Sequence, residues 1–157
     1  HVKAVLGRPF RFVELAQEIN SQMPQYVRSR IQDALNDAGK ALRGSTVLLL
    51  GVTYKPDIAD QRESPVRPLA RALVDSGSTV EYFDPFVSQW NIDSDHGDHE
   101  GDRLLQCVTD LDVAVRDADI VVLLQPHKSL DLASIQSNAQ VLFDTRGKLN
   151  GPNIMRL

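Results

Sequence analysis

Residues 46–65 read TVLLLGVTYKPDIADQRESP and change character halfway along. Residues 47–50 form an unbroken apolar run, which predicts a short strand buried on both faces of a parallel sheet. A polar, charged stretch follows Gly51, and glycine lets the backbone turn sharply or lets a ligand come close. Ser64 and Pro65 predict a helix start, with serine as the N-cap and proline as the first helical residue. Ligands bind at this kind of strand-loop-helix edge in open α/β sheets.

Three further apolar runs predict the other strands of the same sheet, and periodic segments between them predict helices. The expected strands are 79–83, 120–124 and 140–143, and the expected helices are 66–77, 108–118 and 129–137. Strands that alternate with helices pair in parallel through right-handed crossovers, which predicts an α/β domain with an open parallel sheet and flanking helices. After the last strand, residues 148–157 predict only a turn.

The first 44 residues predict a helical arm in two parts. Apolar residues recur at helical spacing over 9–20 and again over 24–41. Pro24 is expected to separate the two helices, because the residue before a proline avoids the helical region of backbone space. Gly44 is expected to end the second helix. Both apolar faces are expected to pack in the core, or at an interface for the first helix, rather than to bind a ligand.

The composition argues against several classes of protein. A net charge of −4 and a pI near 5.5 disfavour nucleic acid or an acidic membrane surface as the main partner. The single cysteine, Cys107, cannot form an internal disulfide, and no apolar run approaches the ~20 residues of a membrane span. We therefore expect a soluble, cytoplasmic protein. Because the chain opens at His1 within what reads as continuing sequence, we also expect a fragment of a longer protein.

Polar residues follow each of the four expected strands, and parallel strands place all four groups at one edge of the sheet. These groups are 51–62, Asp84-Pro85, 125–127 and 144–146. Three cations, Lys55, Arg62 and Arg146, are expected at that edge of an otherwise acidic chain. They suit a phosphorylated ligand, because arginine binds phosphate through two parallel hydrogen bonds and lysine as a point charge. Tyr54 offers a flat ring to a sugar or base.

Each of these side chains has an alternative role within its own loop. Arg146 has a carboxylate two positions away, at Asp144, and Arg62 has three nearby, at Asp57, Asp60 and Glu63. Exposed ion pairs of this kind contribute only ~0–1 kcal/mol to stability. Asp84 either binds a ribose hydroxyl or, as an aspartate before proline, forms a turn.

Residues 89–102 differ from the rest of the chain in their content of acids, histidines and glycines. The calcium-loop pattern requires glycine at its sixth position and glutamate at its twelfth, but counting from Asp93 these positions hold Asp98 and Leu104. The pair His96-x-x-His99 lacks partners at zinc spacing. The segment therefore predicts a mobile surface insertion, with metal binding as the weaker alternative, and we assign no metal ligand.

The charged loop and two later motifs together resemble one family of enzymes. The matching positions are Gly51, Tyr54, Lys55, Asp60, Arg62, Ser64, Pro65, Asp84-Pro85 and Asp144-Thr145-Arg146. They resemble the nucleotide-sugar 6-dehydrogenases, which oxidise UDP-glucose, UDP-N-acetylmannosamine, UDP-N-acetylglucosamine or GDP-mannose to uronic acids with NAD. The resemblance implies a Rossmann-like, nucleotide-sugar-binding domain over residues 45–157. It also implies that residues 1–44 are the end of a central helical region through which subunits form a homodimer.

Carried over by position, the resemblance implies that Tyr54, Lys55 and Arg146 contact the UDP-sugar substrate. It implies that Arg62 reaches the phosphates of NAD, which another domain of the parent enzyme mainly binds. Asp60 is implied to brace the loop. No role follows for Asp84 or for the histidine at position 127, His127.

The sequence also departs from the full pattern of this family. It contains no GxGxxG, and the catalytic cysteine, lysine and asparagine of the family belong to sequence before His1, so we assign no catalytic residue. Cys107 lies outside every family motif and is expected to be a small buried side chain.

We therefore expect the substrate-binding C-terminal domain of an NAD-dependent UDP-sugar 6-dehydrogenase, inactive by itself. The segments MPQYV at 23–27 and RESPV at 62–66 resemble the N-acetylhexosamine branch of the family. The alternative is a stand-alone, non-catalytic module for nucleotide binding or dimerisation.

Overall fold

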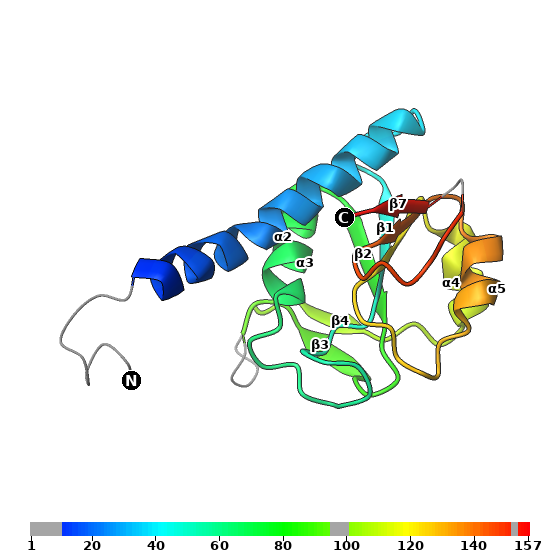
Figure 1. The fold of residues 1–157 in the computed structure, drawn as a ribbon. Helices are drawn as coiled ribbons and strands as arrows, with labels where there is room; N and C mark the ends of the chain where they lie inside the picture. Colours follow the sequence, from blue (N-terminus) through cyan, green and yellow to red (C-terminus); the bar gives the residue numbers. More distant parts are fainter. Residues whose placement is uncertain (1–10, 95–100, 152–153) are drawn as a thin grey trace.

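The computed structural model describes residues 11–94, 101–151 and 154–157, and its centre is a five-stranded parallel sheet (Figure 1). The strands, in the spatial order β2-β1-β5-β6-β7, are β2 (Thr79–Phe83), β1 (Thr46–Leu50), β5 (Ile120–Leu123), β6 (Leu142–Asp144) and β7 (Ile154–Arg156). Leu50 is in register with Phe83 on one side and Leu123 on the other, and Leu123 with Asp144. The carboxyl ends of these four strands therefore lie at one edge of the sheet, as the sequence predicts.

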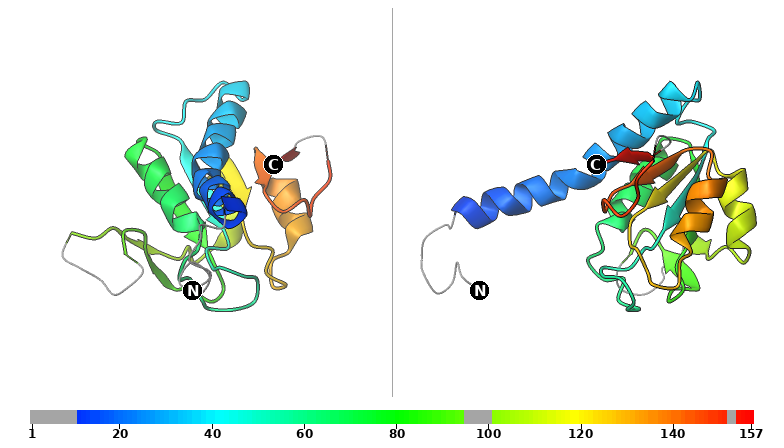
Figure 2. Two further views of the ribbon diagram at one scale, coloured as in Figure 1. Left: turned by 60° about the vertical axis from the view of Figure 1, so that its left-hand side comes forward. Right: turned by 45° about the vertical axis from the view of Figure 1, so that its right-hand side comes forward.

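Two pairs of helices cover the two faces of the sheet (Figures 1 and 2). The helices α2 (Arg11–Asp37) and α3 (Val66–Asp75) pack on one face, where Leu49 and Val122 point. The helices α4 (Leu111–Asp117) and α5 (Leu132–Asn138) pack on the other, where Leu48 and Val121 point. Neighbouring residues of one strand face opposite sides, so a strand that is apolar throughout fills both layers. The expected α/β fold with an open parallel sheet is thus confirmed.

The helical arm differs from the prediction because α2 is one continuous helix with Pro24 inside it. A proline within a helix removes one backbone hydrogen bond and costs about 3 kcal/mol. Val27, Ile31 and Leu35 of α2 are nevertheless buried in the core beside α3 and the sheet. Burial of that face outweighs the lost bond, so the prediction of two helices separated at Pro24 is wrong.

The end of α2 also lies earlier than expected. The helix ends at Asp37, and Gly39 follows with a φ of 73°, the left-handed conformation that ends many helices. The Lys40 amide closes the last turn by donating to the Leu35 carbonyl at 2.8 Å. Gly44, the expected end of the helix, instead lies in the turn that leads into β1.

The first half of α2 extends away from the sheet (Figures 1 and 2). Phe12 is 75% exposed, and three further apolar side chains of this half are also exposed: Val13, Leu15 and Ile19. Nothing in the described part of the chain covers this apolar stripe. The predicted start of the helix at residue 9 lies outside the described residues.

The acidic segment, residues 89–102, begins with a strand that the sequence did not predict. Strand β3 (Gln89–Asn91) pairs antiparallel with β4 (Leu104–Gln106), and Trp90 and Ile92 are fully buried in the core. The prediction of a mobile insertion throughout 89–102 is therefore wrong for residues 89–92. His96 and His99 lie outside the described residues. Elsewhere in the described chain no group of three or more His, Cys, Asp or Glu is arranged to hold a metal.

Two helix starts and one strand also differ from the prediction. Asp110 caps α4 by accepting from the Val113 amide at 3.0 Å, and Asp131 caps α5 by accepting from the Ser134 amide at 3.0 Å. These caps place the helix starts about a turn later than the periodicity indicates. The tail forms the edge strand β7, where the sequence predicts only a turn.

Candidate functional site at the carboxyl edge of the sheet

The loops that follow β1 and β5 lie side by side at the carboxyl edge (Figure 1). The Gln125 side-chain amide donates to the Tyr54 carbonyl at 2.9 Å, which joins the two loops directly. Gly51, with a φ of 81°, makes this approach possible. A Cβ at that position would lie 2.5 Å from Gln125 Cβ, so only glycine fits between the loops.

A buried pair of ionisable side chains, Asp84 and His127, underlies these loops. Asp84 is 2% exposed and His127 is 1% exposed. Asp84 Oδ2 accepts hydrogen bonds from the Val52 amide at 2.8 Å and from His127 Nε2 at 3.1 Å. Asp84 Oδ1 accepts from the Phe86 amide at 2.9 Å. The carboxylate therefore joins the ends of β1 and β2 to the loop after β5.

His127 joins the same loops from its other ring nitrogen. Its Nδ1 accepts a hydrogen bond from the Asp57 amide at 3.0 Å, so the ring proton is assigned to Nε2. Asp57 has a φ of 62°, a left-handed conformation, and its Oδ1 accepts from the Lys128 amide at 2.9 Å. The amide and the carboxylate of Asp57 are thus both held by residues of the loop after β5.

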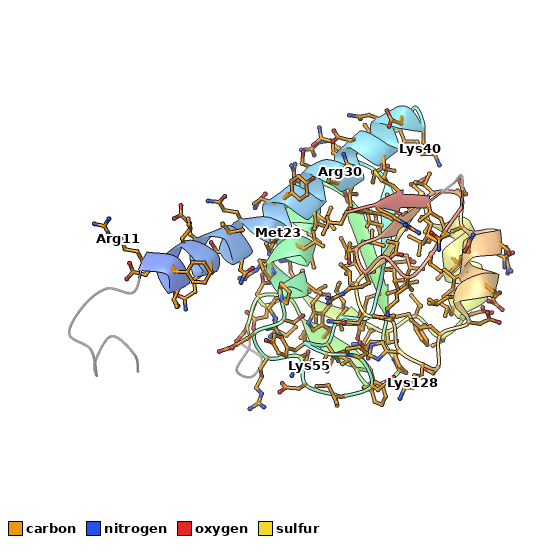
Figure 3. The ribbon with its side chains drawn as sticks, viewed as in Figure 1. Arg11, Met23, Arg30, Lys40, Lys55 and Lys128 are labelled. Atoms are coloured by element: carbon orange, nitrogen blue, oxygen red, sulfur yellow. The ribbon has the colours of Figure 1, made fainter. Side chains whose placement is uncertain are left out.

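Tyr54 and Lys55 have a fixed backbone and exposed side chains. The Tyr54 amide donates to the Asp60 carbonyl at 2.8 Å, and the Thr53 hydroxyl donates to the Lys55 carbonyl at 2.9 Å. Tyr54 is 49% exposed, and Lys55 Nζ lies 5.7 Å from the centre of its ring, within cation–π distance. Lys55 makes no ion pair with any other described residue, and Figure 3 shows it at the same edge as Lys128.

Arg62 pairs with Asp60, one of the three carboxylates that the sequence offers it. Arg62 Nε and Nη2 donate to the two Asp60 oxygens at 2.9 Å each. These hydrogen bonds lower the pKa of Asp60 to about 2 and raise the pKa of Arg62. The Arg62 side chain is 70% exposed, so the pair is open to solvent and to an incoming anion.

Arg146 lies at the end of β6 beside a small pocket. Its Nε donates to the Leu124 carbonyl at 2.5 Å, and its amide donates to Asp144 Oδ1 at 2.7 Å. The Asp144 carboxylate is fully buried and accepts backbone N–H groups, including the Leu149 amide at 2.7 Å. The alternative of a side-chain ion pair between Arg146 and Asp144 is therefore wrong. The pocket, about 150 Å³, lies between Arg146, α2 and the start of α3.

The structure changes the capping prediction for α3 and agrees with the prediction for Cys107. Helix α3 starts at Val66 with Pro65 as its N-cap residue, so the prediction of Ser64 as the N-cap and Pro65 as the first helical residue is wrong by one position. Ser64 Oγ accepts a hydrogen bond from the Val66 amide, at the long distance of 3.4 Å. Cys107 is partly buried, with its Sγ 3.6 Å from the Asp84 carbonyl. That environment agrees with the predicted small core side chain.

The sequence did not assign Asp84 or His127 because their roles depend on loops distant in the chain. The available signal was their position, because Asp84 directly follows one strand and His127 lies a few residues after another. Such a polar side chain, buried at a strand end, needs partners from neighbouring loops.

The fold defines a Rossmann-like α/β domain, and comparison with known proteins names its family. Residues 48–151 match the model of the UDP-glucose/GDP-mannose dehydrogenase family, UDP binding domain. The chain belongs to this family, which confirms the resemblance noted from the sequence.

Similar proteins carry dehydrogenase names. The chain is 30% identical over 149 residues to UDP-N-acetyl-D-mannosamine dehydrogenase of Methanocaldococcus jannaschii, covering 89% of this chain and 30% of the relative. It is 28% identical over 146 residues to UDP-glucose 6-dehydrogenase of Rhizobium meliloti, covering 88% of this chain and 30% of the relative. The chain therefore spans less than a third of the length of these relatives.

Solved structures agree in fold. A UDP-D-ManNAc dehydrogenase from Pyrococcus horikoshii superposes with a TM-score of 0.76 at 21% identity, over 98% of this chain and 35% of that one. An NDP-N-acetyl-D-galactosaminuronic acid dehydrogenase from Methanosarcina mazei Go1 superposes with a TM-score of 0.71 at 25% identity, over 91% of this chain and 30% of that one. Among the helices that the structure describes, none is long and apolar enough to cross a membrane.

Proposed function

We propose that this chain is the substrate-binding domain of an NAD-dependent UDP-sugar 6-dehydrogenase, which oxidises the C6 alcohol of a UDP-hexose or UDP-N-acetylhexosamine to a carboxylate. The observation that carries the proposal is that Lys55 and Arg146 follow β1 and β6, whose carboxyl ends share one edge on either side of β5. Membership of the UDP-binding family and the names of the relatives support it.

In this proposal Lys55 and Arg146 bind the diphosphate of the UDP-sugar. Lys55 has no carboxylate partner in the described chain, and the Arg146 side chain donates from Nε to a carbonyl. Both cations therefore keep donors for phosphate oxygens. The exposed ring of Tyr54 would pack on the sugar or base, where its flat apolar face meets a ring of similar size.

NAD is the expected cofactor of the parent enzyme, and it accepts the hydride removed from the substrate alcohol. Of the residues described here, Arg62 suits its phosphates, because its guanidinium is exposed and paired only with a surface carboxylate. A phosphate group that displaces the Asp60 carboxylate would accept hydrogen bonds from the same two donors, Arg62 Nε and Nη2. The main binding site for NAD is expected in a part of the parent that precedes this chain.

The proposed substrate class includes both hexoses and N-acetylhexosamines, because the relatives' names refer to both. The names of relatives include UDP-N-acetyl-D-mannosamine dehydrogenase and UDP-glucose 6-dehydrogenase. The motifs at residues 23–27 and 62–66 favour an N-acetylhexosamine.

We also propose a cytoplasmic homodimer that forms through the first half of α2. This half exposes an apolar stripe that includes Phe12 and Ile19, whereas the second half is buried in the core. A second copy would cover the stripe.

The division of the chain at residue 44 stays a prediction, since Val27 and Leu35 of the arm pack within the same core as the sheet.

Calorimetric titration of the 157-residue chain with UDP, UDP-GlcNAc and NAD tests the proposal. UDP and UDP-GlcNAc are expected to bind, and NAD to bind far more weakly, because the chain supplies one arginine for it. Absence of UDP binding, or equal affinity for NAD, would contradict the assignment. The gene upstream separates the proposal from a stand-alone module: the enzyme requires a strand followed by GxGxxG and a loop with a cysteine.

A further inference from the structure

We infer that Asp84 and His127 are positioning residues that fix the orientation of the ligand-binding loop, residues 53–57, against the loop after β5. The inference rests on the proposed function, because it takes Tyr54 and Lys55 as ligand contacts. Both side chains of the pair have no exposed surface, so neither touches a bound nucleotide directly. Any effect of the pair on binding must therefore pass through the loop.

The hydrogen bonds of His127 have fixed directions. The Asp57 amide is a donor, so Nδ1 of the ring accepts, and Nε2 donates to Asp84 Oδ2. Thr53 Oγ1 lies 3.4 Å from the same Nε2, and its own hydroxyl proton is directed to the Lys55 carbonyl. One imidazole thus contacts the beginning and the end of residues 53–57.

The Asp84 carboxylate fixes the orientation of the His127 ring. Within the described chain it forms no ion pair with lysine or arginine, and its charge is stabilised by N–H donors. These are the amides of Val52, Thr53 and Phe86 and the His127 ring. A buried carboxylate with this set of partners holds the imidazole in one tautomer, since Nε2 must carry the proton.

The backbone of the loop needs a contact of this kind at Asp57. Asp57 adopts a φ of 62°, a conformation that residues with a Cβ rarely adopt, and it lies two positions after Lys55. The imidazole holds its amide and the Lys128 amide holds its carboxylate. Without the imidazole acceptor the Asp57 amide would be left without its partner, and the loop would sample other conformations.

The consequence for binding follows from preorganisation. A ligand that meets an ordered loop loses less conformational entropy than a ligand that must order the loop itself. Asp84 and His127 therefore raise the affinity for UDP through the positions of Tyr54 and Lys55.

The experiment measures UDP binding by calorimetry in the 157-residue chain. His127→Gln keeps a donor near the place of Nε2 but removes the Nδ1 acceptor, and it is expected to weaken UDP binding about tenfold. His127→Asn keeps an acceptor near the place of Nδ1 and is expected to lose less UDP affinity than His127→Gln. Ser129→Ala, an exposed position in the same loop, is the matched control and is expected to bind UDP like the unchanged chain. Thermal unfolding of each variant identifies any that fails to fold.

A double-mutant cycle separates positioning from general loss of structure. If His127 acts through the loop, His127→Gln weakens UDP binding much less in a chain that already carries Lys55→Ala, because the ligand contact that His127 positions has been removed. The two losses of binding free energy are then not additive. Additive effects, or unchanged UDP affinity in a folded His127→Gln, would overturn the inference. Absence of UDP binding by the unchanged chain would instead refute the proposed function itself.

Discussion

Replacing Gly51 by alanine tests how closely the loop after β1 approaches the loop after β5. The added Cβ would lie 2.5 Å from Gln125 Cβ and 2.6 Å from the Gln125 carbonyl oxygen. Real Cβ atoms do not approach so closely, so one of the two loops must move. Gly51 also has a φ of 81°, which alanine adopts only with strain.

The expected cost has two parts. The left-handed backbone costs an L-residue about 1–2 kcal/mol, and the overpacking of a tight contact adds about 1–3 kcal/mol. Gly51→Ala should therefore lower the free energy of unfolding by about 2–5 kcal/mol. Urea denaturation of the chain measures this loss.

Gly39→Ala is the matched control because its φ of 73° is similar but no atom lies within 4 Å of the added Cβ. It should show only the backbone cost of about 1–2 kcal/mol. Equal losses in the two variants would show that the loops are not in contact at Gly51, and the reasoning about this edge would be refuted.

Three further predictions concern Arg62, Asp60 and the two halves of α2. Arg62→Ala in the full-length enzyme should raise KM for NAD more than KM for the nucleotide sugar, and the opposite bias in steady-state kinetics would contradict its assignment. The Asp60 carboxyl should titrate by NMR at a pKa of about 2, so its pairing with Arg62 is present at neutral pH and is lost as the pH falls through that value. In Arg62→Ala the titration should return toward 3.8, and an unchanged midpoint would contradict the pairing. Ile31→Ala should cost about 2–5 kcal/mol in urea denaturation because the side chain is fully buried, whereas Leu15→Ala, at 54% exposed, should cost much less. Equal costs would contradict the packing of α2.

The sequence predicted the parallel strands well where they form apolar runs buried on both faces. The predicted range 79–83 coincides with β2, and β1 begins one residue before its apolar run. Strand β7 was not predicted because its three residues, Ile154–Arg156, are too few for a periodic signal. Strands β3 and β4 were not predicted either, because each has only three residues and because polar residues separate Trp90 from Leu105, its partner on the neighbouring strand.

Local rules failed where tertiary contacts decide the structure. Proline at position 24 predicts a break, but the face of α2 that follows it is buried and keeps the helix continuous. The edge could be located from the sequence because polar residues follow each strand. The bond from the Phe86 amide to Asp84 is the local turn that the sequence offered as one alternative. The other partners of Asp84 could not be predicted, because Val52 and His127 come from two distant loops. Only the folded register of the strands brings these residues together.

The central claim is that Lys55 and Arg146 bind one diphosphate, and UDP titration of single variants tests it most directly. Each of Lys55→Ala and Arg146→Ala removes a charge-assisted contact worth ~1.5–3 kcal/mol, so each should weaken UDP binding about 10- to 150-fold. Arg116→Ala, which removes an exposed cation from α4, should leave the affinity unchanged. If the Lys55 and Arg146 variants bind UDP as tightly as the unchanged chain does, the claim is wrong.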